Sequence, residues 1–146
     1  MPRIIPCFTL ILFLVALIAG CGDRVKTAPV SGRVTYKGKP VPNANVSFSP
    51  AESGGRAATG ITDSAGRFTL GTSSTNDGAL IGKYQVSVIA RGPDRPPKAG
   101  ESLSGMPGEM MPGDPIIPTK YFAPDTSGLT HEVKRGSNHV DLDLKD

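Results

Sequence analysis

The sequence predicts an all-β protein, a sandwich of about seven short antiparallel strands. Short segments alternate apolar and polar residues, which is the period of a strand with one buried face. The 146 residues include 18 Gly and 14 Pro, which end such strands in turns, and no stretch after residue 21 keeps a helical period. Two antiparallel sheets packed face to face fit this pattern better than a barrel or an α/β fold.

The first two strands are predicted at residues 30–36 and 44–48. Between them, Lys37-Gly38-Lys39-Pro40 supplies a turn, because Gly38 can adopt a positive φ. Alternation assigns the inward side chains of the two strands: Val30, Val34, Tyr36, Ala44, Val46 and Phe48.

The middle of the chain supplies three more strands. Residues 58–62 form a weak strand whose register stays open. A hairpin loop, with Asp63 at its start and Gly66 at a left-handed position, leads into residues 67–70. The strongest strand signal follows at residues 83–90. The inward side chains of the last two strands are Phe68, Leu70, Tyr84, Val86 and Val88.

Residues 92–118 interrupt this pattern, and two strands follow them. The segment is rich in Pro and Gly and has few bulky apolar residues, so we expect a mobile insertion at 92–115. The closing strands are predicted at residues 129–133 and 140–144, with a turn at 134–138 between them. In the last strand the inward side chains are Val140, Leu142 and Leu144.

The N-terminus has the pattern of a lipoprotein signal peptide, predicted at residues 1–20. Arg3 gives a positive start, residues 7–18 give an apolar segment too short to span a bilayer comfortably, and small residues precede Cys21. We therefore expect cleavage before Cys21 and lipid attachment to its sulfur. An ordinary secretory signal cleaved nearby, or an uncleaved N-terminal anchor, remains an alternative.

The mature chain is then one domain on a short polar tether. Residues 21–29 are predicted to be the tether, and residues 30–146 the domain. Cys7 leaves with the signal peptide and Cys21 carries lipid, so no disulfide can stabilise the fold. The formal net charge of the full chain is only +3 and its charges are scattered, which argues against nucleic acid as a partner.

The predicted strands and turns resemble those of a known family. Val30-Ser31-Gly32-x-Val34-Thr35-Tyr36-x-Gly38-x-Pro40 resembles the opening of carboxypeptidase regulatory-like domains, and Ala44-x-Val46-x-Phe48, Thr62-Asp63-x-x-Gly66-x-Phe68-x-Leu70 and Gly82-x-Tyr84-x-Val86-x-Val88 continue the match. The stretch from Ile117 to Thr130 is similar to the C-terminal half of bacterial lipoproteins that carry this domain. The insertion at 92–115 lies outside the shared pattern.

The resemblance implies a transthyretin-like, Ig-like β-sandwich that serves as an accessory, binding or spacer module at the cell envelope. It implies no reaction, because peptidases that carry such a domain hold their zinc and catalytic residues in a separate domain. The expectation is therefore a non-enzymatic protein without a cofactor, held on the periplasmic or outer face of a bacterial membrane.

The catalytic and metal-binding patterns of the chain agree with that expectation. Only two histidines exist, His131 and His139, without the spacing of a zinc motif, and no Gly-x-Ser-x-Gly turn occurs. His131 is expected half-buried on an edge strand, and His139 in the turn before the last strand. Asp63-x-x-Gly66 lacks the further acidic residues of a calcium loop and is interpreted as a turn.

Three methionines in the insertion are the one unusual cluster. The thioethers of Met106, Met110 and Met111 are soft ligands of the kind that Cu(I) prefers, so Cu(I) binding is a minor hypothesis. The alternative interpretation is a loop with incidental methionines, or an apolar patch that packs on a partner.

The sequence leaves three functions open. The first is a structural or protein-binding module anchored through Cys21, with an envelope protein as partner for the insertion or for an edge strand. The second is binding of a carbohydrate or cell-wall polymer, for which Tyr121 and Phe122 are the only adjacent aromatic pair. The third is handling of Cu(I). Tyr84 is given a structural role, with its ring buried and its hydroxyl on backbone.

Overall fold

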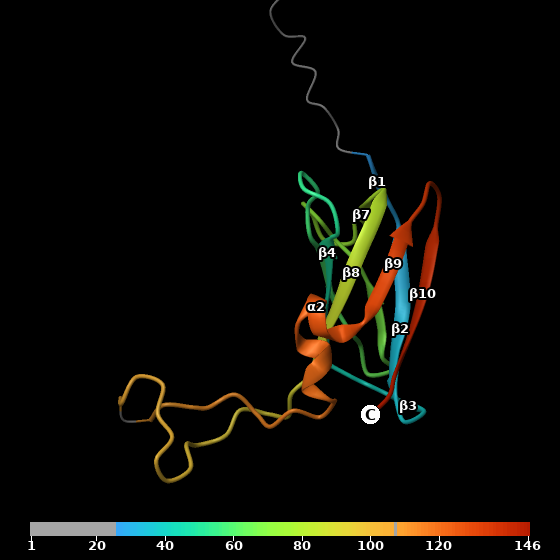
Figure 1. The fold of residues 1–146 in the computed structure, drawn as a ribbon. Coiled ribbons are helices and arrows are strands. Elements are labelled where there is room, and N and C mark those ends of the chain that lie inside the picture. Colours follow the sequence, from blue (N-terminus) through green and yellow to red (C-terminus); the bar gives the residue numbers. More distant parts are fainter. Residues whose placement is uncertain (1–25, 107) are drawn as a thin grey trace, which may run out of the picture.

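The computed structural model describes residues 26–106 and 108–146, and these residues form a β-sandwich (Figure 1). The predicted signal peptide, Cys21 and most of the predicted tether lie outside the described residues. No helix in the described ranges is long and apolar enough to cross a membrane.

The first sheet is built around a central strand, β2 (Val30–Tyr36). Strand β10 (Asn138–Leu144) pairs with one edge of β2 over seven residues. On its other edge β2 pairs in turn with β6 (Arg67–Thr69) and β3 (Lys39–Pro40). The two-residue turn between β2 and β3 has positive φ at both Lys37 and Gly38, as a type I′ hairpin requires.

The second sheet has the strand order β5-β4-β8-β9 and is antiparallel throughout. Its strands are β5 (Ala58–Ile61), β4 (Asn45–Pro50), β8 (Gly82–Ile89) and β9 (Leu129–Val133). A small pair, β1 (Thr27–Ala28) with β7 (Ala79–Leu80), lies apart from both sheets. A 3-10 turn, η2 (Thr119–Phe122), and one helical turn, α2 (Pro124–Ser127), precede β9.

The predicted inward faces form one core between the two sheets. Among the described residues, the largest fully buried side chains are Phe48, Leu70, Leu144, Val30, Val34, Val46, Val86, Val88 and Val133. Gly32 permits a close approach inside the first sheet, because a Cβ there would lie 1.9 Å from the Val140 carbonyl oxygen. The prediction of an all-β sandwich is confirmed, and the strands of three or more residues correspond to the seven predicted.

The prediction that every strand pair is antiparallel is wrong for one pair, because β10 runs parallel to β2. Residues 134–137 carry the chain from β9 in the second sheet to β10 in the first, so they are a crossing and not a hairpin. The turn at Asp63 to Gly66 likewise joins β5 and β6, which belong to different sheets. Alternation assigns a face to each strand, but not the partner or direction of that strand.

The domain also begins earlier than predicted, within the segment assigned to the tether. Ala28 is buried in β1, and the carbonyl oxygen of Pro29 accepts a hydrogen bond of 2.9 Å from the Asn138 N–H. His139, predicted in a turn, lies inside β10.

The sandwich has two ends, which we call the tether end and the arm end (Figure 1). The tether end is where residue 26 enters, and strand register places Gly82 opposite Val133 there. The arm end is where β8 finishes at Ile89, opposite Asn45. The predicted insertion, residues 92–115, leaves from the arm end and extends away from the sandwich (Figure 1). We call these residues the arm.

Candidate functional site

The base of the arm is closed by backbone contacts between its two limbs. Gly92 donates a hydrogen bond of 2.9 Å to the Asp114 carbonyl, and Arg91 bridges to Pro115. The limbs approach so closely that a Cβ on Gly113 would lie 2.0 Å from the Gly92 carbonyl oxygen. A glycine at position 113 is therefore required for this closure.

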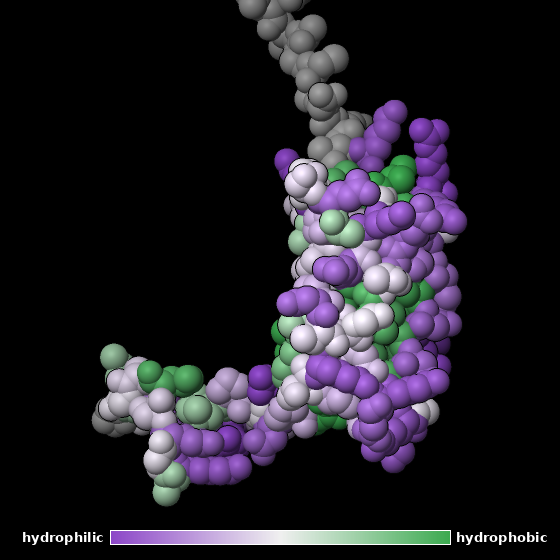
Figure 2. Space-filling view, viewed as in Figure 1, coloured by the Kyte–Doolittle hydropathy of each residue, from purple (hydrophilic) through white to green (hydrophobic). Residues whose placement is uncertain are grey.

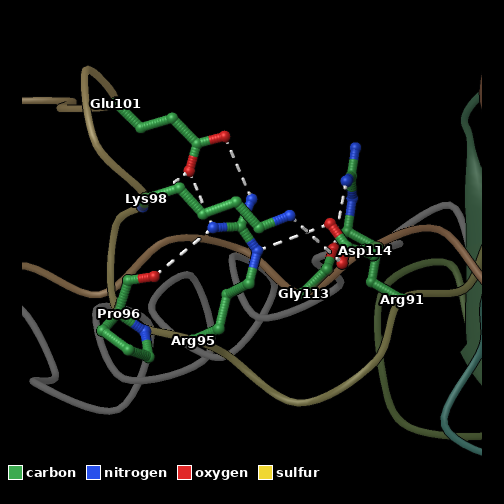
Figure 3. Close-up of polar contacts among 7 residues, drawn as sticks. All are labelled: Arg91, Arg95, Pro96, Lys98, Glu101, Gly113 and Asp114. Atoms are coloured by element: carbon green, nitrogen blue, oxygen red, sulfur yellow. Dashed lines mark hydrogen bonds and ion pairs between the residues drawn. The ribbon is translucent and has the colours of Figure 1, made fainter.

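Arg95 forms a clamp farther along the arm (Figure 3). Its guanidinium holds the Glu101 carboxylate through two hydrogen bonds, of 2.7 and 3.2 Å, and its Nε lies 3.4 Å from an Asp114 oxygen. The backbone of Arg95 exchanges two further hydrogen bonds with Met111, of 2.9 and 2.7 Å. The Arg95 hydrogen bonds and the Lys98 N–H lower the pKa of Glu101 to about 2. The clamp therefore carries its charges at neutral pH.

The outer loop of the arm is organised by Glu109. Its carboxylate accepts hydrogen bonds from the N–H groups of Leu103 and Ser104, of 2.6 and 2.8 Å, and from the Ser102 hydroxyl. The large apolar side chains there point to solvent: Leu103 is 69% exposed, Met106 70% and Met110 51%. Figure 2 shows hydrophobic surface on the outer part of the arm. We call Leu103, Met106 and Met110 the arm tip.

The predicted Cu(I) ligands are spread over the arm. Met106 and Met110 belong to the exposed tip, whereas Met111 is half-buried beside Arg95. Within the described ranges no three His, Cys, Asp or Glu side chains gather as a metal site. Cu(I) binding through the three thioethers stays a prediction.

A second concave surface lies between β5 and the loop that follows β6. This groove has a volume of about 750 Å³ and an uncharged lining. The loop is held rigidly, because Asp77 accepts hydrogen bonds from the N–H groups of Thr72, Ser73 and Ser74. Hydroxyl and amide side chains dominate the lining: Asn45, Thr59, Thr69, Thr72, Ser73, Ser74, Thr75 and Asn76. We call it the hydroxyl groove.

The aromatic pair predicted to face a glycan is not available for that role. Tyr121 is buried, and its hydroxyl exchanges hydrogen bonds of 2.9 Å with the backbone of Lys145. Phe122 is half-buried, and the Arg91 guanidinium covers its ring at 4.9 Å. The two rings pack the arm end of the sandwich, so they do not provide the solvent-facing aromatic surface that a glycan site usually presents.

The remaining singled-out residues have structural positions. Tyr84 is buried and its hydroxyl lies 3.4 Å from the Arg56 carbonyl, which confirms the predicted role. His131 is half-buried on the edge strand β9, as predicted, and stands edge-on to Phe48 at 5.9 Å. Burial lowers the pKa of His131. His139 is exposed, with its Nε2 3.2 Å from Asp141.

Sequence reasoning located the arm but missed the clamp and the groove. Arg95, Glu101 and Asp114 follow no period, so their spacing carries no signal of a shared site. The groove joins residues from β4, β5 and the loop after β6, which only the sheet topology brings together. Cys21, the predicted lipid attachment site, lies outside the described residues.

Comparisons with known proteins leave the family of this chain open. No family model and no curated protein matches the sequence. Among solved structures, a DUF3823 family protein from Parabacteroides merdae is 15% identical with a TM-score of 0.41, and the match covers 82% of this chain and 46% of that one. The dioxygenase domain of a dioxygenase and carbohydrate-binding protein fusion from Streptomyces sp. SirexAA-E is 19% identical with a TM-score of 0.39, covering 84% and 83%. At these TM-scores neither likeness bears on the function of this chain.

Proposed function

We propose that this chain is a non-enzymatic lipoprotein of the bacterial cell envelope, in which the sandwich is a spacer that presents the arm to a protein partner. The observation that carries the proposal is the position of the arm. It leaves the sandwich at the end opposite to the one where residue 26 enters (Figure 1). A lipid on Cys21 would thus hold the tether end at the membrane and leave the arm at the far end of the sandwich (Figure 1).

The arm has the properties of a recognition segment. Its base and clamp are closed by hydrogen bonds, so its limbs are already paired before binding, which reduces the ordering cost of binding. Its tip presents three exposed apolar side chains of the kind that anchor interfaces, with methionine able to adapt to an irregular surface. The partner expected for such a tip is an envelope protein with an apolar groove.

Stable anchoring requires more than one acyl chain. Each buried methylene contributes about 0.8 kcal/mol, and a single chain gives only marginal binding. A diacylglycerol on the Cys21 sulfur together with an amide-linked acyl chain would supply that surplus. Replacing Cys21 with Ala is therefore expected to remove the protein from the membrane fraction.

The test is in-cell photocrosslinking from the arm tip, with a photoreactive residue in place of Leu103. We expect one dominant crosslinked envelope protein, lost when Met106 and Met110 are also replaced by Ser. A matched control places the photoreactive residue at Lys39, exposed at the same end of the sandwich. Equal crosslinking of the same protein from both positions, or none from the tip, would contradict the proposal.

A second candidate function, carbohydrate or cell-wall polymer binding, is favoured by the hydroxyl groove. An uncharged lining of hydroxyl and amide groups can exchange hydrogen bonds with sugar hydroxyls. Calorimetric titration with cell-wall oligosaccharides tests it. Binding that is lost in Asn45→Ala/Thr59→Val and retained in Leu103→Ala/Met106→Ala would place this function in the groove instead of the arm.

A further inference from the structure

A hollow lies beside the predicted tether. It has a volume of about 550 Å³ and lies at the tether end. Three segments that are distant in sequence line it: the entering chain with β1, the β7–β8 junction, and the crossing from β9 to β10. The lining residues are Lys26, Thr27, Ala28, Pro29, Ile81, Arg135 and Gly136.

The charge of this hollow is positive. Lys26 and Arg135 line it, and no carboxylate is among its described lining residues. The nearby Lys134 is already paired, since its Nζ lies 3.6 Å from Glu132. Asp77, in the loop before β7, directs its carboxylate to the N–H groups of residues 72–74. Among the described residues neither cation of the hollow has an ion-pair partner, so both can interact with an external anion.

One apolar side chain completes the surface. Ile81 is 48% exposed at the rim, directly before β8. Two cations beside an exposed aliphatic residue match a layer in which phosphate groups adjoin acyl chains. A soluble anion would use the cations but not the isoleucine.

The short segment between Cys21 and Lys26 indicates that the ligand of the hollow is a lipid headgroup. Cys21 precedes Lys26 by five residues, and five extended residues reach at most about 18 Å. Asp23 and Arg24 in that segment cancel each other in charge. If Cys21 carries lipid, the hollow cannot leave the vicinity of the headgroup layer, where the local concentration of lipid phosphate is very high.

We propose that this hollow seats the tether end on anionic phospholipid headgroups of the membrane that holds the anchor. Lys26 and Arg135 contact lipid phosphate, and Ile81 enters the layer beneath. The sandwich then stands on the membrane in one orientation and does not swing on its tether. This inference rests on the proposed lipid anchor, and it adds an orientation that the anchor alone does not impose.

The test uses the lipidated mature protein in nanodiscs of neutral phosphatidylcholine, with or without phosphatidylglycerol. Intact mass first establishes the acyl chains on Cys21, so a missing anchor is recognised before the orientation is measured. Ser137→Cys, in the exposed crossing, then gives a single free thiol for a fluorophore, and a quencher on the lipid headgroups reports its proximity.

We expect stronger quenching in discs with phosphatidylglycerol than in neutral discs, and loss of most of this increase in Lys26→Gln/Arg135→Gln. The matched control, Lys39→Gln/Arg67→Gln, removes two positive charges elsewhere on the sandwich and should keep it. Equal quenching in both lipids, or equal loss in the control, would overturn the inference while leaving the anchor intact.

A second measurement needs no anchor. The full mature chain with Cys21→Ser should prefer phosphatidylglycerol vesicles to phosphatidylcholine vesicles in sedimentation. Two cations near an anionic surface make this preference roughly 30-fold, and the Lys26→Gln/Arg135→Gln variant should lose it. Absence of the preference in the mature chain that carries Cys21→Ser alone would overturn the inference.

Discussion

The sandwich and the arm are stabilised by different kinds of contact. In the sandwich, apolar side chains from both sheets are removed from water. The described part of the arm is closed by backbone hydrogen bonds and by an Arg95 clamp, while the apolar side chains of its tip remain exposed. Burial is additive over many residues, whereas exposed ion pairs contribute little each. We therefore expect global stability to reside in the sandwich, and the arm to open locally without unfolding it.

The largest expected effect is loss of a core aromatic ring. Phe48 is fully buried and packs against Tyr84 and His131 at ring distances of 5.8 and 5.9 Å. Phe48→Ala should lower the free energy of unfolding by about 3–5 kcal/mol in urea denaturation. Leu103→Ala in the arm should change it by less than about 0.5 kcal/mol. Similar effects of the two changes would end the distinction between sandwich and arm.

A smaller loss is expected at a buried hydroxyl that closes the arm end of the sandwich. The Thr62 hydroxyl donates to the Val41 carbonyl and accepts from the Ala44 N–H, both at 2.7 Å. Thr62→Val leaves both backbone groups unpaired and should cost about 1–3 kcal/mol of unfolding free energy. The exposed Thr75→Val is the control and should be nearly neutral. An equally neutral Thr62→Val would show that these groups find other partners.

The pH dependence of stability between 7.5 and 5.5 should be weaker still and should come from the sandwich. The folded state holds the pKa of His131 below its usual 6.5, so the unfolded chain binds the proton more readily. The contribution of His131 to the free energy of unfolding is therefore fully present above pH 6.5, and it declines as the pH falls below that value. His131→Gln should reduce the fall of the urea midpoint over this pH range. An equal decline in His131→Gln would show that another group causes the pH dependence of stability.

The smallest effect concerns the clamp and should leave global stability unchanged. Glu101 titrates with a pKa of about 2 when it is paired with Arg95, against a usual value of 4.5. The clamp is thus complete above pH 4.5 and weakens as the pH falls toward 2. In Arg95→Gln, carboxyl NMR should show the pKa of Glu101 rising toward its usual value, with the Lys98 N–H still lowering it in part, and Lys134→Gln should not move it. Titration of Glu101 near 4.5 in the unaltered chain would contradict the clamp.

The same contrast explains which features could be predicted from sequence. Alternation assigned Val30, Val46, Phe48 and Leu144 to the core, because burial on one face of a strand leaves a two-residue period. Neither the parallel pairing of β10 with β2 nor the sheet crossing at 134–137 leaves such a period. Both depend on contacts between residues that are far apart in the chain.

The candidate sites were predictable only in part. The break in composition at 92–115 located the arm. The clamp inside the arm could not be predicted, because its charged residues are irregularly spaced in the sequence. The sequence marks Tyr121 only as part of the one adjacent aromatic pair, with Phe122. In the fold Tyr121 is buried and its hydroxyl donates to the carbonyl of Lys145, a distant contact that the local sequence does not reveal. The role of a side chain that bonds to distant backbone can be assigned only when the fold is known.

The proposed function places the sandwich between the arm and the membrane. The direct measurement is the distance from the headgroup plane to a fluorophore at Ser104→Cys in the arm or at Ser137→Cys at the tether end, on lipidated protein in nanodiscs. Eight residues of β8 run from one end to the other, so the arm label should lie farther out by roughly 20 Å. Equal distances, or an arm label nearer the membrane, would contradict this arrangement of sandwich, arm and membrane.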